Sequence, residues 1–187
     1  MRRTIAKEIR KSGTALHAGG TVNMTLSPAP SGSGVLFRRA DLGGKEIPAL
    51  YDRVGETRLG TVIAQGDASV GVIEHLMAAV AGAEIDDLLV TVDGPEPPIL
   101  DGDALSYFQL LDEAGNKEQS GERKAIKVTK PVEITIKDAR IRLLPSDTPE
   151  YSYDLDYSNT KAIGKQSYRM TLTRENFARE IAPSRTF

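Results

Sequence analysis

The sequence contains no cysteine and only two histidines among its 187 residues. The absence of cysteine excludes disulfides, thiolate catalysis and zinc sites that use cysteine ligands. Any metal site in this chain must therefore use histidine and carboxylate groups. The formal net charge of −2 gives no excess of positive potential for phosphate backbones, so we do not expect nucleic acid as a partner.

Long apolar runs are also missing. Acidic residues interrupt the most apolar region, so no segment approaches the roughly 20 apolar residues of a membrane span. Residues 1–13 are basic but lack the continuous apolar stretch of a secretory signal. We therefore expect no transmembrane segment and a cytoplasmic location. An apolar fraction of 40% with 27% charged residues is typical of a globular protein.

Residues 1–116 predict an α+β domain. Short apolar or alternating runs bounded by Gly, Pro and Ser turns predict strands, and apolar residues three and four apart predict two helices. The first helix is expected to begin near Ser69 and to end at Gly82. The second is expected to begin at a cap, Asp101 or Asp103, and to end at Gly115. The predicted strands cover residues 21–26, 35–37 and 88–92.

Residues 117–125 are polar and predict a linker, and residues 126–187 predict a partial second α+β domain. Its expected strands cover residues 126–129, 132–136, 139–143, 151–157 and 168–172, with a short helix capped by Thr173. A sheet needs its apolar face covered, and only one helix is available here. We therefore expect the second domain to be incomplete in this chain.

Glu74 and His75 are the residues that best suit chemistry. Neighbours on a helix point about 100° apart, so the two cannot chelate one ion together. They can flank an ion, with the histidine as ligand and the glutamate facing a bound water. The pair alone is a weak signal, because no second histidine follows one turn later, and a solvated helix face is the alternative.

Several segments of the sequence resemble the UDP-3-O-acyl-N-acetylglucosamine deacetylases, zinc enzymes of lipid A synthesis. The most specific are Glu74-His-Leu76 and Pro95-Glu-Pro-Pro-Ile-Leu-Asp-Gly102. The resemblance runs from Thr4 to Phe187. It implies an α+β fold of two similar domains, each a mainly antiparallel sheet packed on two helices. It also implies hydrolysis of the N-acetyl group of a UDP-linked, acylated amino sugar.

The resemblance also implies roles for individual residues. His75 matches one zinc ligand and Glu74 matches the general base. The family's other two ligands, a His and an Asp, lie in a later segment that this chain lacks, since its only other histidine is His17. Thr186 matches a residue that stabilises the oxyanion, and Phe187 one that packs on the substrate.

Two more residues are expected near the substrate. Leu59, expected in a small inserted sheet of the first domain, matches a residue near the acetamide group. His17 lies near the family's site, although a hydrogen bond that stabilises its own turn is the simpler interpretation of that residue. Both are carried over as substrate-binding residues.

The missing ligands leave three hypotheses about the chain. The first is a fragment of the deacetylase that binds zinc poorly, because losing two of three ligands removes most of the coordination energy. The second is a non-catalytic binding module that keeps the fold. The third is one half of a split enzyme, completed by a separate chain that carries the missing ligands.

Overall fold

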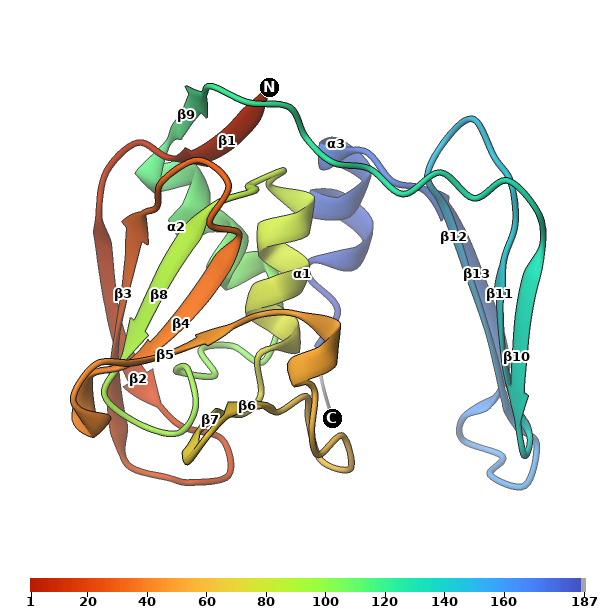
Figure 1. Cartoon of the computed structure of the whole chain (residues 1–187). Helices are drawn as coiled ribbons and strands as arrows, with labels where there is room; N and C mark the ends of the chain where they lie inside the picture. Colours follow the sequence, from red (N-terminus) through yellow and green to blue (C-terminus); the bar gives the residue numbers. More distant parts are fainter. Residues whose placement is uncertain (186–187) are drawn as a thin grey trace. The chain divides into compact units, whose positions relative to one another are not determined.

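The computed structural model describes residues 1–185 (Figure 1), which form two compact units. One unit holds residues 1–123 together with the segment from Phe177 onward, and the other holds residues 124–176. The strands are mostly antiparallel, which confirms the predicted α+β class. No helix in the described residues is both long and apolar enough to cross a membrane.

A five-stranded sheet forms the centre of the first unit, in the order β2-β3-β8-β4-β5. All neighbours are antiparallel except β4 and β8. Alternate residues of β3 and β8 are buried, and these place one apolar face toward the helices. The strands are β2 (Ile9–Thr14), β3 (Thr21–Pro28), β4 (Val35–Arg39), β5 (Lys45–Pro48) and β8 (Leu88–Val92).

Two helices, α1 (Glu74–Gly82) and α2 (Leu105–Ala114), cover this apolar face and contact each other (Figure 1). The expected start of α1 at Ser69 was wrong. Ser69 lies in β7 (Ala68–Val70), which pairs with β6 (Ile63–Gln65), and Val72 has a positive φ of 53° that a helix cannot contain. The chain therefore turns before α1 begins.

The start of α2 is capped by Asp103 rather than Asp101. Its Oδ1 accepts hydrogen bonds from the backbone N (3.0 Å) and the Oγ (2.9 Å) of Ser106. Short 3-10 helices, η1 (Ala40–Leu42) and η2 (Tyr51–Arg53), precede β5 and β6.

The segment expected to be a linker begins with a strand. β9 (Asn116–Gln119) pairs antiparallel with β1 (Arg2–Ile5), with Arg2 opposite Gln119 and Ile5 opposite Asn116. Backbone pairing needs no apolar side chains, so the polar sequence of β9 gave no sign of it. The predicted limits of the domains, 1–116 and 126–187, remain a prediction.

The second unit consists of two antiparallel hairpins. One pairs β10 (Val132–Ile136) with β11 (Ala139–Leu143), and the other pairs β12 (Glu150–Tyr157) with β13 (Gly164–Thr171). Residues 126–129, expected as a strand, have no regular structure. The cross-strand pair Ile134 and Ile141 is 59% and 70% exposed, so these apolar side chains do not form a core within the described residues.

The chain then returns to the first unit through α3 (Arg174–Asn176) and a π-helix (Phe177–Ile181). Thr173 Oγ1 accepts a hydrogen bond from Asn176 N (3.1 Å), as the predicted cap requires. The buried ring of Phe177 packs on Phe108 of α2, with 5.7 Å between ring centroids, and on Gly82 of α1. Ala182 O accepts hydrogen bonds from the first amides of α2.

Candidate active site

Glu74 and His75 are the first two residues of α1, and both are half-buried. The carboxylate of Glu74 accepts a hydrogen bond from Thr61 N at 2.8 Å through Oε2. An acidic residue in the first turn is also favoured by the helix dipole. The helix start and the loop before β6 thus hold the Glu74 carboxylate in one place.

Tyr107 of α2 is close enough to Glu74 to feel its charge. Its hydroxyl is buried and donates a hydrogen bond to Pro98 O. Burial, and secondarily the negative charge of Glu74, raise the pKa of the Tyr107 phenol far above its usual range. Tyr107 therefore stays protonated beside Glu74 and tethers the start of α2 to the Pro98 segment.

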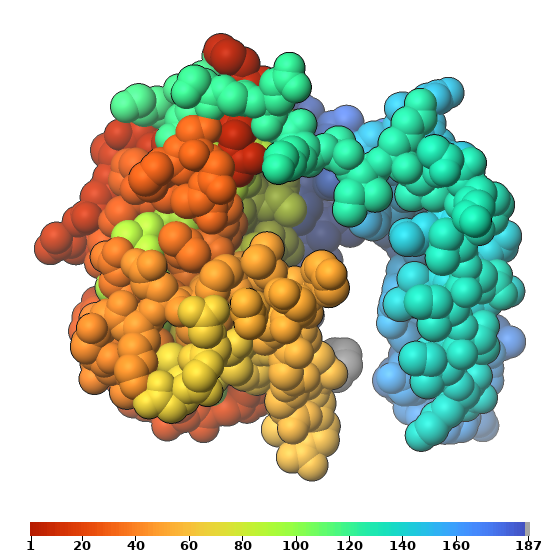
Figure 2. Space-filling view, viewed as in Figure 1, coloured from red at the N-terminus to blue at the C-terminus, as the bar shows by residue number. Residues whose placement is uncertain are grey.

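The loop that contains Leu59 is closed at its base. Val54 pairs with Ile63, and Gly55 N donates to Val62 O at 2.8 Å. Leu59 lies in a bend of this loop rather than in the small sheet where it was expected, and it is 68% exposed. Figure 2 shows the residues between η2 and β6, in gold, projecting from the surface of the first unit.

His17 connects this loop to the turn between β2 and β3. Its Nε2 lies 3.0 Å from Leu59 O. A carbonyl oxygen can only accept, so Nε2 must carry the hydrogen in this contact. The expected stabilising hydrogen bond of His17 therefore exists, but it joins two loops rather than closing its own turn. It joins His17 to the loop of Leu59, and the Thr61 amide of the same loop bonds to Glu74.

Glu96 is a residue of this region that no sequence motif singled out for a role. It is only 7% exposed, and its two carboxylate oxygens accept from His17 N (2.9 Å) and Ala18 N (3.1 Å). The one available signal was an acidic residue placed among the prolines of Pro95-Glu-Pro-Pro98. A backbone that prolines restrict holds its side chains in fixed directions.

A match to a protein-family model shows which family this chain belongs to. Residues 2–187 match the family model described as UDP-3-O-acyl N-acetylglycosamine deacetylase. The chain belongs to this family. The match includes Glu74 and His75 as well as the loop of Leu59 and the turn of His17.

Similar curated proteins carry the name UDP-3-O-acyl-N-acetylglucosamine deacetylase. One from Anaeromyxobacter sp. (strain Fw109-5) is 42% identical over 185 residues, which are 99% of this chain and 60% of that protein. One from Chlamydia abortus is 37% identical over 99% of this chain and 66% of that protein, and one from Nitratiruptor sp. is 40% identical over 99% and 61%. The chain thus spans 60–66% of the length of these relatives.

The described residues of this deacetylase-family chain contain no group of three or more His, Asp or Glu side chains placed to hold a metal ion. A structural or catalytic zinc site needs at least three protein ligands. The described residues therefore do not form a zinc site by themselves, and the role of His75 as a ligand stays a prediction. Thr186 and Phe187, the other predicted site residues, lie outside the described residues.

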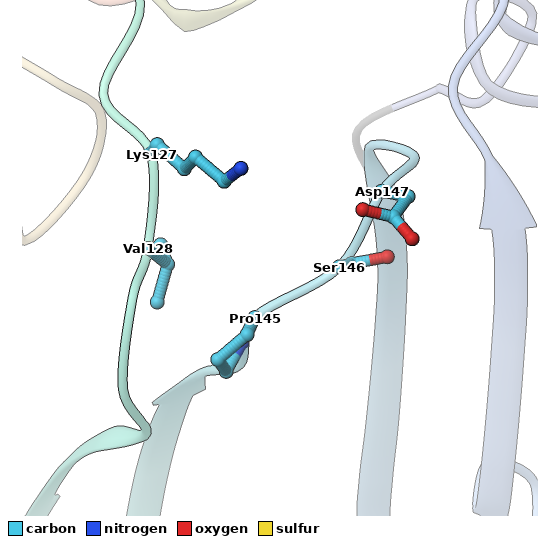
Figure 3. Close-up of a pocket in the computed structure, with 5 residues that line it drawn as sticks. All are labelled: Lys127, Val128, Pro145, Ser146 and Asp147. Carbon is cyan, nitrogen blue, oxygen red and sulfur yellow. The ribbon is translucent and has the colours of Figure 1, made fainter.

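A shallow pocket in the second unit contains none of the candidate residues. Figure 3 shows that it is lined by two segments of that unit, before β10 and after β11. Its lining is exposed or half-buried. The lining residues are Lys127, Val128, Pro145, Ser146 and Asp147.

Proposed function

We propose that this chain provides the base-carrying part of a deacetylase that hydrolyses the N-acetyl group of UDP-3-O-acyl-N-acetylglucosamine, an early step of lipid A synthesis. The observation that carries the proposal is the family match over residues 2–187, which includes the Glu74–His75 pair at the start of α1. The names of the relatives state the same reaction.

In this proposal Glu74 is the general base. One of its oxygens accepts from Thr61 N, and the other, Oε1, remains available to a water molecule. A Cβ at position 60 would lie 3.2 Å from Oε1, so Gly60 keeps that approach open. Glu74 would take the proton of the water that attacks the acetamide carbonyl, and the amine would then leave with a proton.

His75 would supply one ligand to zinc, which acts as a Lewis acid toward the carbonyl when it is bound. The remaining ligands would come from residues outside this sequence, because its only other histidine, His17, bonds to Leu59 O. A separate chain could supply them in a split enzyme. The expected cytoplasmic location stays a prediction.

The residues proposed to bind the substrate lie in the loop and the turn that are linked to Glu74 by hydrogen bonds. Two hydrogen bonds hold the loop of Leu59, from His17 to Leu59 O and from Thr61 N to Glu74, and the Leu59 side chain is exposed. We assign Leu59 and His17 to contact with the sugar near the acetamide group. Thr186 and Phe187 keep the oxyanion and substrate roles that the family resemblance gives them.

Zinc content and amine release test this function together. The chain would be assayed alone and mixed with the part of the Anaeromyxobacter relative that lies outside the match. We expect the chain alone to hold little zinc and release no amine, and the mixture to do both. Near-stoichiometric zinc with turnover in the chain alone would refute the assignment of the remaining ligands to other residues.

Two substitutions then separate the roles. In the active mixture, Glu74→Gln should keep zinc and lower amine release by about 10²–10⁴-fold, the usual contribution of a general base. His75→Gln should lower the zinc content itself. Glu84→Gln is the matched control, because Glu84 lies just beyond the other end of α1 and pairs with Arg3. Unchanged turnover in Glu74→Gln would contradict the proposed base.

A further inference from the structure

Glu96 occupies an unusual position for a carboxylate. It is buried, its backbone lies between Pro95 and Pro97, and its two oxygens each accept from one of two consecutive amides, those of His17 and Ala18. Hydrogen bonds to an ionised acceptor are roughly twice as strong as neutral ones. Glu96 therefore fixes the turn between β2 and β3 to the Pro95–Pro98 segment.

The same segment is itself anchored near α1. Pro95 O accepts from Gly71 N at 2.8 Å, three residues before Glu74. The Glu96 clamp and the start of α1 are thus parts of one framework.

A continuous series of hydrogen bonds runs from this clamp to the proposed base. The ring of His17 reaches Leu59 O at 3.0 Å, and two residues later Thr61 N donates to Glu74 Oε2 at 2.8 Å. The series joins four segments of the chain, which contain Glu96, His17, Leu59–Thr61 and Glu74. A loss at its first member would release the turn, then the loop, and finally the amide that orients the Glu74 carboxylate.

We propose that Glu96 is a positioning residue for Glu74, acting through His17 and the loop Leu59–Thr61. The role of Glu74 as base rests on the proposed function, whereas the series of contacts does not. Small displacements of a general base matter, because proton transfer requires a hydrogen-bond distance to the water.

The partners of Glu96 make a clean substitution possible. In the described part of the chain they are backbone amides, with no Lys or Arg among them. Glu96→Gln keeps the size of the side chain but replaces one acceptor oxygen with an NH2 group, which faces an amide donor. One hydrogen bond of the clamp is lost without breaking an ion pair.

The test uses nuclear magnetic resonance on the isotope-labelled full chain. The readouts are the hydrogen exchange rate of the Thr61 amide and the ring signals of His17, both remote from position 96. We expect Glu96→Gln to speed Thr61 exchange on the order of tenfold, as loss of a hydrogen bond to a charged group implies, and to shift the His17 ring signals toward those of a free imidazole. A uniform loss of stability would instead speed exchange in β8 as well.

Asp93→Asn is the matched control. Asp93 lies three residues before Glu96, is exposed, and accepts from Asn23 N at 2.7 Å, outside the series. It should leave Thr61 and His17 unchanged. The proposal is overturned if Glu96→Gln frees the His17 or the Ala18 amide while the Thr61 rate and the His17 ring signals stay at their original values.

A second pair of variants tests the middle of the series should Glu96→Gln fail to fold. His17→Ala removes the donor to Leu59 O and should speed Thr61 exchange, whereas His17→Gln offers an amide donor and should restore most of the protection. An unchanged Thr61 rate in His17→Ala overturns the proposal. These readouts need no turnover, so failure of the deacetylase assay would leave their result intact.

Discussion

The contact between Gly82 of α1 and the ring of Phe177 gives a sharp test of how the returning segment is held. Gly82 is the last residue of α1, and a Cβ built on it would overlap the Phe177 ring well inside van der Waals contact. Phe177 is buried and also packs on Phe108. We therefore expect the effect of Gly82→Ala to reverse its sign when Phe177 is absent.

The magnitudes follow from opposing terms. In the natural background, Gly82→Ala gains up to about 1 kcal/mol from helix propensity but forces a displacement of the ring, and overpacking typically costs about 1–3 kcal/mol. We expect a net loss of about 1–2 kcal/mol in the free energy of unfolding. Phe177→Ala alone should cost about 3–5 kcal/mol. In that background the overlap is gone, so Gly82→Ala should stabilise by up to about 1 kcal/mol.

Amide exchange in β8 is the assay, because β8 is the central strand of the first unit and reports that unit alone. Comparing the natural chain, the two single variants and the double variant gives the coupling energy, expected near 2 kcal/mol. Equal effects of Gly82→Ala in both backgrounds would refute the packing argument. A stabilising Gly82→Ala in the natural background would also refute it.

Two further predictions concern carboxylates. Burial disfavours the charged form of Asp87, but the guanidinium of Arg2 and the amides of Gly34 and Gly32 outweigh it and hold the pKa of Asp87 below its usual value. Because the folded pKa is lowered, this stability is present above the unfolded pKa, near 4, and is lost as the pH falls through the folded pKa. Asp87→Asn should thus lower the free energy of unfolding by about 3 kcal/mol at pH 7 and by clearly less in acid. Urea unfolding at several pH values measures this difference, and a loss that is independent of pH would contradict the prediction. Hydrogen bonds from Ser158 and, to a lesser extent, Lys165 lower the pKa of Asp156 to about 2. Ser158→Ala should therefore raise the titration midpoint of Asp156 more than Lys165→Met does, as followed by the carboxyl resonance of Asp156. A larger rise in Lys165→Met would contradict this order.

Elements with strong local signals were predicted well from the sequence. The strand at residues 88–92 was predicted to the residue, because an apolar, β-branched run ends at Asp93-Gly94. The start of α1 was not, since the apolar spacing continues through Val72 and its positive φ depends on neighbouring parts of the fold. β9 was missed for a related reason. Its pairing with β1 joins residues more than a hundred positions apart and leaves no periodicity in a polar segment.

In the candidate site, too, some features were predicted from the sequence and others were not. Glu74 and His75 were singled out because they are adjacent and lie within a segment that resembles the family, and their roles stay a prediction. The contact of His17 with Leu59 and the clamp by Glu96 depend on loops that meet only in the folded chain, since Glu96 is 79 residues from His17. Local sequence reports the chemistry of a side chain, whereas these contacts are set by the packing of distant segments.

The pairing of β1 with β9 also has a mechanical consequence. Arg2 faces Gln119 and the strands are antiparallel, so residues 1 and 120, which flank this ladder, lie at the same end of it. A force that separates these two residues pulls the ladder open from that end and breaks its hydrogen bonds one after another. It does not shear them all at once. The β1–β9 ladder is therefore expected to separate at low force, while the five-stranded sheet is still intact.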